Sequence, residues 1–155
     1  MKIINLFLLI FLILGCKENY TEKKIEIPPS VTKWNVNDEP PSIKLCDEIS
    51  SESERNICFQ EKLLILIYDN IDFSEITVAK KLNDTLILSL LIDKNGKISF
   101  LNTSISFQIK SQIPLIDTIL KKAISELPII LPATKTNIGV QVSSSLELPL
   151  ILTTN

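Results

Sequence analysis

The side chains best suited to covalent chemistry in this 155-residue chain are three cysteines, Cys16, Cys46 and Cys58. A catalytic cysteine is usually activated by histidine, and the sequence contains no histidine. The common zinc sites, which combine cysteine with histidine, are also unsupported. Asp93 and Asp117 fall in an expected turn and at an expected helix start, where solvation and capping account for them. We therefore expect no catalytic residues, no metal and no cofactor, and the chain is not expected to be an enzyme.

Cys16 follows a short apolar segment at the start of the chain. A cationic start precedes residues 3–14, which are apolar except for Asn5. This pattern is typical of a secretory signal peptide, and the run is shorter than the ~20 residues that a membrane-spanning helix needs. Ile13-Leu14-Gly15-Cys16 resembles a bacterial lipobox, which implies that residues 1–15 are removed and that Cys16 is acylated. The alternative is a soluble exported protein in which this cysteine occurs by chance.

Cys46 and Cys58 remain after Cys16 is assigned to the anchor. An even number of cysteines in an exported, oxidising setting favours a disulfide between them. Closing this short loop would stabilise the fold by roughly 3 kcal/mol in the chain-entropy model. Free thiols are the alternative, because the sequence does not give the geometry that a disulfide requires.

The length allows one domain with tails, and the charge is unremarkable. A formal net charge of −2 offers no basic surface, so no nucleic-acid partner is expected. Residues 16–45 are interpreted as a tether, polar at first and then carrying two proline pairs that favour extended backbone. We expect this tether to be mostly disordered, although Ile25–Ile27 and Val31–Val36 could add a short strand. The domain is then expected over residues 46–155.

Three segments carry helix signals. Ser51-Glu52-Ser53-Glu54 has the form of a capping box, Ser74 can cap a short helix, and Pro114 suits the first turn of another. Apolar residues at helical spacing follow the first and the third of these signals. The helices expected are residues 52–70, a short helix that Ser74 caps and that runs to residue 82, and a helix with Pro114 in its first turn that runs to residue 127 and is ended by Pro128.

The strongest structural signal lies in Asp84–Phe107. Two apolar, β-prone runs meet at Asp93-Lys94-Asn95-Gly96-Lys97, which predicts a β-hairpin. Asn95-Gly96 could form a two-residue type I′ loop, or the glycine could take the left-handed position of a three-residue loop with a bulge. The run Leu86–Ile92 suggests a strand covered on both faces or along most of its length. The returning strand changes phase, which predicts a bulge near Phe100-Leu101.

A final strand is expected from Asn137 onward, with Pro149 limiting its hydrogen bonding near the end. Helices alternate with these strands along the chain. The order predicts an α+β domain with two helices packed on a small antiparallel sheet of about three strands.

The order of these segments resembles the C-terminal domain of TonB proteins, in the form found in Bacteroidetes-type bacteria. The likeness covers about residues 40–152 and lies in LILSLLIDKNGKISFLNTSI, Leu115–Ile124, Leu127-Pro128, Pro132-Ala133, Gly139-Val140 and LELPLIL, preceded by Pro40-Pro41, Cys46 and Cys58-Phe59. The chain departs from the pattern at Ile43-Lys44-Leu45, Phe73-Ser74 and Asn83-Asp84, and is therefore similar to a diverged member.

The resemblance implies a module that binds a short extended peptide of an outer-membrane transporter by strand addition. If the last strand is an exposed edge, the first residues to consider for partner binding are Gly139, Val140, Gln141 and Val142; otherwise they only complete the sheet. With an acylated Cys16, the expectation is a lipid-anchored binding module of the cell envelope, at the outer membrane and facing the periplasm. Its partner would be an outer-membrane transporter or another envelope protein.

A structural or assembly lipoprotein is the alternative. It would self-associate as a homodimer through the same sheet edge and take no part in transport. A lipid anchor would in either case provide no transmembrane element for energy transduction.

Overall fold

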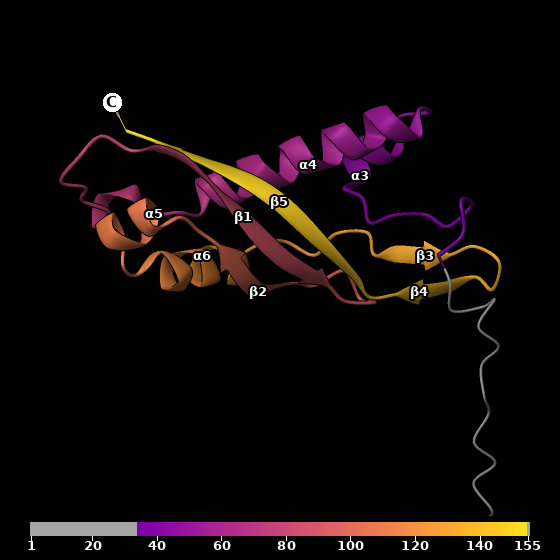
Figure 1. Ribbon diagram of the computed structural model, residues 1–155. Coiled ribbons are helices and arrows are strands. Elements are labelled where there is room, and N and C mark those ends of the chain that lie inside the picture. The colour runs from indigo at the N-terminus through magenta and orange to yellow at the C-terminus, as the bar shows by residue number, and fades with distance from the viewer. Residues whose placement is uncertain (1–33, 155) are drawn as a thin grey trace, which may run out of the picture. The chain divides into compact units, whose positions relative to one another are not determined.

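The computed structural model describes residues 34–154, which form an α+β fold (Figure 1). The main sheet is antiparallel with the order β2-β1-β5, and β3 and β4 form a separate two-stranded sheet. The predicted class, with a small antiparallel sheet of three strands, is confirmed. The elements are α3 (Lys44–Asp47), α4 (Glu52–Asp69), a 3-10 turn (Phe73–Glu75), β1 (Asn83–Ile92), β2 (Ile98–Ser104), α5 (Phe107–Gln112), α6 (Ile116–Ser125), β3 (Ala133–Lys135), β4 (Val140–Val142) and β5 (Ser144–Thr153).

The predicted signal peptide (1–15), the lipidation site Cys16 and the tether up to residue 33 lie outside the described residues. Within residues 34–154, no helix combines the length and the apolar character needed to cross a membrane.

The predicted hairpin is confirmed, and its loop has three residues. The Asp93 carbonyl accepts a hydrogen bond from the Gly96 N–H at 2.9 Å, and the Asp93 N–H donates to the Lys97 carbonyl at 3.0 Å. Gly96 has φ +80°, the left-handed position that follows the turn, so the two-residue alternative is wrong. The Asp93 carboxylate accepts the N–H groups of Lys97 and Asn95 at 3.0 and 2.8 Å, and these bonds lower the pKa of Asp93. Asp93 therefore stabilises the turn.

The predicted bulge in β2 is confirmed as well. Ser89 of β1 pairs with Asn102 and the next residue, Leu90, pairs with Phe100, so Leu101 is the extra residue. Its side chain is 48% exposed. The strand ends at Ser104, before the end of the segment Asp84–Phe107 that was predicted to form the hairpin.

A short helix, α5, replaces the end of the predicted strand. Ser106 caps it, because the Ser106 Oγ accepts the Ile109 N–H at 3.2 Å. Ile109 is buried, whereas Phe107 is exposed.

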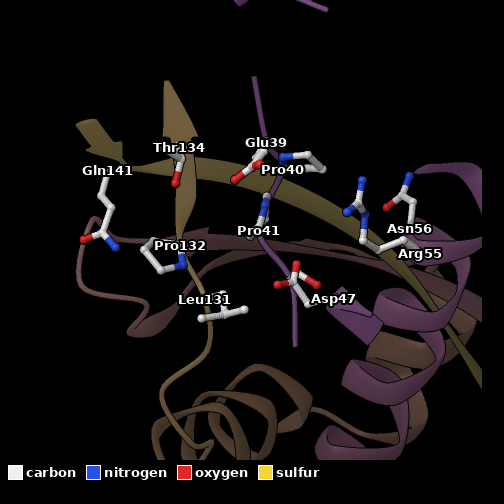
Figure 2. A pocket seen from close by; sticks show the side chains of 11 residues that line it. Glu39, Pro40, Pro41, Asp47, Arg55, Asn56, Leu131, Pro132, Thr134 and Gln141 are labelled. Carbon is white, nitrogen blue, oxygen red and sulfur yellow. The ribbon is translucent and has the colours of Figure 1, made fainter. Parts of the chain in front are cut away.

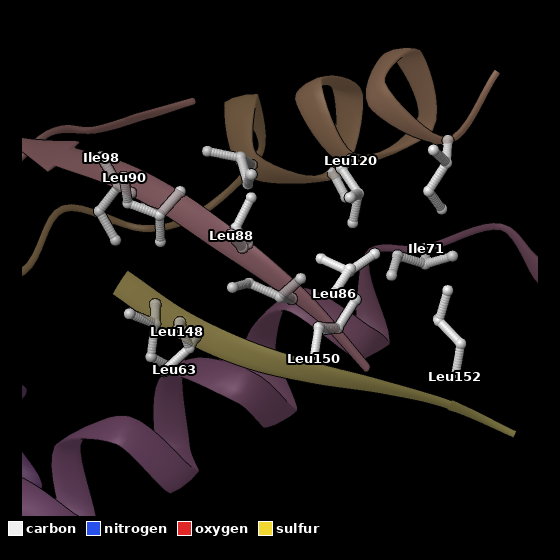
Figure 3. Packing of buried hydrophobic residues seen from close by; sticks show 14 of the residues in the cluster. Leu63, Ile71, Leu86, Leu88, Leu90, Ile98, Leu120, Leu148, Leu150 and Leu152 are labelled. Carbon is white, nitrogen blue, oxygen red and sulfur yellow. The ribbon is translucent and has the colours of Figure 1, made fainter. Parts of the chain in front are cut away.

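The core lies on one face of the main sheet. Buried residues alternate along β1 with residues that are only partly buried, so this strand is covered on one face and not on both. Contacts join α6 to β2 and α4 to β5, and both helices contribute to one apolar cluster with the sheet. Figure 3 shows Leu88 and Leu148 from the sheet in this cluster, with Leu63 of α4 and Leu120 of α6.

Helix α4 begins as predicted, with the Ser51 Oγ accepting the Glu54 N–H at 3.4 Å. Helix α6 lies within its predicted range. The predicted helix over residues 74–82 is wrong, since only Phe73–Glu75 forms a single turn, which Asp72 caps. The β-branched run Ile76-Thr77-Val78 follows, and such residues disfavour a helix.

Residues 34–43, hereafter the strap, were assigned to the tether but lie against the domain. Glu39 and Thr134 exchange two backbone hydrogen bonds at 2.9 Å, and Ser42 bonds to Leu131 in the same way. The strap therefore runs beside β3. Described residues that precede Cys46 therefore pack on the domain.

Two further connections hold the start of the domain. A disulfide joins Cys46 to Cys58 of α4, with 5.8 Å between their Cα atoms. An ion pair joins the strap to β3, where the Lys135 Nζ lies 2.7 Å from the Asp38 carboxylate and both side chains are buried. Asp38 also accepts the N–H of Asn35 at 2.7 Å. These contacts, chiefly the bond from Lys135, hold the pKa of Asp38 below its ordinary value, so this carboxylate is charged at neutral pH.

Candidate functional site

β5 is an edge strand, and half of its backbone groups point away from the sheet. At the end of the strand, the Thr154 N–H donates to the Leu82 carbonyl at 2.9 Å, and the register continues from Asn83–Thr153 to Ile92–Ser144. Antiparallel strands bond at every second residue, so the even-numbered residues of β5 bond to β1. The residues whose N–H and C=O groups point to the free edge are Ser145, Glu147, Pro149, Ile151 and Thr153.

The second half of this edge is closed to a further strand. Pro149 has no N–H to offer. The Ile151 carbonyl accepts a hydrogen bond from the Tyr68 hydroxyl at 2.6 Å. Burial raises the pKa of Tyr68, which keeps this phenol protonated and able to donate.

The first half is open. Among the described residues, the backbone N–H and C=O groups of Ser145 and Glu147 have no hydrogen-bond partner. The side chains of both residues are exposed on the solvent face of the sheet, whereas Leu146 between them points to the core face and is half-buried. Unpaired backbone groups at a sheet edge can pair with an incoming strand. We call Ser145–Glu147 the open edge.

The structure places Gly139–Val142 elsewhere. The predicted single final strand is wrong, because it divides at Ser143 into β4 and β5, and β4 pairs with β3 instead of the main sheet. Gly139 lies in the preceding turn with φ +64°. Val140 and Val142 are opposite Lys135 and Ala133, whose backbone groups point away from the strap, so only Gln141 directs its backbone groups outward.

Ser145 and Glu147 were missed by the sequence reasoning, although a signal was present. Proline occurs in strands where its absent N–H would face an edge. Pro149 therefore indicates that the backbone groups of the odd-numbered residues of β5 face the free edge, and residues 147 and 145 are among them.

The two carboxylates considered at the start do not come together with other reactive groups. Asp117 accepts a hydrogen bond from the Thr103 hydroxyl and lies 3.3 Å from the Lys110 Nζ at the surface. Asp93 is engaged in its turn. In the part of the chain that the structure describes, no group of three or more His, Cys, Asp or Glu side chains could hold a metal ion.

A cavity of about 260 Å³ adjoins the open edge, and we call it the edge cavity. Its walls come from the strap, from α4 and from the beginning of β5. The lining residues are Trp34, Pro40, Pro41, Asn56, Phe59, Ser144, Ser145 and Leu146.

The strap separates the edge cavity from a smaller and more polar pocket of about 180 Å³. Figure 2 shows Pro40 and Pro41 between Thr134 and Gln141 of the small sheet and Arg55 of α4. Because Asp38 fixes the strap to Lys135, the proline wall of the edge cavity is held in place.

A third, largely apolar cavity of about 420 Å³ lies at the far end of β5. Tyr68 and Phe73 line it with their rings stacked 6.4 Å apart. The edge beside it is the closed half, so a strand cannot pair there along the backbone. The open edge with its own cavity is therefore the stronger candidate site.

Comparisons of the chain with protein-family models, with curated proteins and with solved structures found no match.

Proposed function

We propose that this chain is a lipid-anchored module of the cell envelope that binds an extended peptide of a partner protein by strand addition to β5. The open edge carries the proposal, because Ser145 and Glu147 present both backbone groups without partners among the described residues. Each backbone bond formed contributes about 1 kcal/mol net. So short an edge gives weak binding on its own, and side-chain contacts must add affinity and selectivity.

The start of the sequence supports the location. The apolar segment ending in Cys16 resembles a lipoprotein signal, and the resemblance to TonB C-terminal domains supports an outer-membrane transporter or another envelope protein as the partner. The module would then sit on the outer membrane and face the periplasm. It would bind its partner there without transmitting energy from another membrane.

Photo-crosslinking from the edge cavity tests the binding mode. A photoreactive amino acid at Asn56 of the full chain, expressed in its native cells, should give an adduct with one partner protein. Ser145→Pro should reduce this adduct about tenfold, since proline removes an outward N–H and obstructs an added strand. Ser145→Ala keeps the N–H and should leave the adduct unchanged.

A probe at Lys121, which is exposed on α6, is the positional control. An adduct that persists in Ser145→Pro would contradict strand addition at this edge. An adduct with a second copy of the chain would instead identify the self-associating alternative.

The anchor has its own test. Cys16→Ser should abolish the incorporation of labelled fatty acid into the chain, because the Cys16 thiol is the group that would be acylated. Lys17→Ser, one residue further on, is the matched control and should incorporate the label as the unaltered chain does. Incorporation that persists in the Cys16→Ser chain would contradict a lipid anchor at Cys16.

A further inference from the structure

We propose that the edge cavity selects peptides in which a basic residue is followed by an apolar residue, Lys/Arg-apolar-small polar in the direction antiparallel to β5. This inference rests on the proposed function, since it assigns the side chains that the added strand must carry.

The apolar position follows from the faces of the sheet. Residues directly opposite each other in antiparallel strands have their side chains on the same face. Leu146 points to the face that the helices cover, so the peptide residue opposite Leu146 points there too. The edge cavity lies on that side, and Leu146 itself forms part of its wall.

The wall chemistry sets the kind of side chain. Trp34, Phe59 and two prolines contribute apolar surface, and the volume of about 260 Å³ accommodates an aliphatic or aromatic side chain. Trp34 is 54% exposed, and its ring would be covered by the occupant. The Ser144 Oγ is the one buried side-chain polar atom without a hydrogen-bond partner among the described residues. None of the residues that line the cavity has a charged side chain.

The basic position follows from Glu147. This side chain is exposed on the solvent face and makes no ion pair with any described residue. Its neighbour across the β1–β5 ladder is Ser89, which is uncharged. Opposite charges on directly facing residues of paired strands attract. A Lys or Arg opposite Glu147 therefore fixes the peptide's direction and register, with a small polar residue opposite Ser145.

Synthetic peptides test this assignment on the purified full chain in detergent micelles. The probe is acetyl-Ser-Thr-Lys-Leu-Thr-Thr-Ser-amide, and the signal is the fluorescence of Trp34, the single tryptophan of the chain. We expect replacement of the peptide's Leu by Gly to weaken binding at least tenfold. Replacement of its Lys by Glu should weaken binding at least threefold.

Two backbone-methylated peptides separate pairing from side-chain selection. N-methylation of the peptide's Lys removes an N–H that faces β5 and should abolish binding. N-methylation of its Leu changes an N–H that faces away from β5 and should have little effect.

Matched protein variants locate the subsite. Ser144→Val adds apolar bulk on the core face beside the cavity and should remove the preference for Leu over Gly. Ser145→Val adds the same bulk on the solvent face and should preserve that preference.

Equal affinity for the Leu and Gly peptides, with N-methyl-Lys still abolishing binding, would overturn the subsite and leave strand addition intact. No binding of the parent peptide at millimolar concentration would also overturn the subsite. The proposed function would then be decided by the loss or persistence of the Asn56 adduct in Ser145→Pro.

Discussion

Replacing Gly96 by alanine should destabilise the domain by about 4 kcal/mol, a value seen for few single substitutions. A Cβ built on Gly96 would lie 1.8 Å from the Ile130 carbonyl oxygen and 2.9 Å from its carbon. These are backbone atoms, and the Ile130 N–H also donates to the Gly96 carbonyl at 3.0 Å, so the backbone at Ile130 cannot move away without losing that bond. Chemical denaturation monitored by circular dichroism would measure the loss.

Gly139→Ala is the matched control. Gly139 also has positive φ, +64°, but nothing lies within 4 Å of its Cβ position. Only the left-handed backbone is then penalised, at about 1–2 kcal/mol. Equal costs for the two substitutions would show that the contact between the hairpin loop and the backbone of Ile130 does not form.

Removing the disulfide with Cys46→Ala and Cys58→Ala together should cost roughly 3 kcal/mol, because the unfolded chain regains the freedom of the closed loop. This is a large fraction of the 5–15 kcal/mol typical of a domain. A reducing agent should lower the melting temperature of the unaltered chain as much as the double substitution does.

The double variant is its own control for side effects of the reductant and should not respond to it. A melting temperature of the unaltered chain that is insensitive to complete reduction would contradict a stabilising bond. Mass spectrometry of the alkylated protein would verify the state of Cys46 and Cys58 in each sample.

Local sequence patterns predicted most of the fold. Asp93 to Lys97 predicted the hairpin because a glycine that takes positive φ and a carboxylate that accepts backbone N–H groups act within five residues. The phase change at Phe100-Leu101 predicted the bulge for an equally local reason, since alternation in a strand cannot shift otherwise. The capping box predicted the start of α4.

Features that depend on distant residues were not predictable in this way. Asp38 and Lys135 are separated by 97 residues, and neither has a local pattern that announces a buried pair. From local sequence alone, the strap has only the polar and proline-containing character of a tether. The division of the last strand at Ser143 likewise depends on β3, a partner too short to be recognised from its own sequence.

Pro149 and the hydroxyl of Tyr68 also limit aggregation of the protein through its sheet edge. A long exposed edge is a template for chain-to-chain polymerisation, in which each added copy offers the next a new edge. Here backbone pairing of a second chain along β5 would end after Glu147, because Pro149 has no N–H and the Ile151 carbonyl already accepts a hydrogen bond from Tyr68. Under the proposed lipid anchoring, copies of the chain would be concentrated on a membrane surface and would meet often. Pro149 and Tyr68, which limit the length of β5 that can pair with a peptide, therefore also protect the protein from forming amyloid-like stacks.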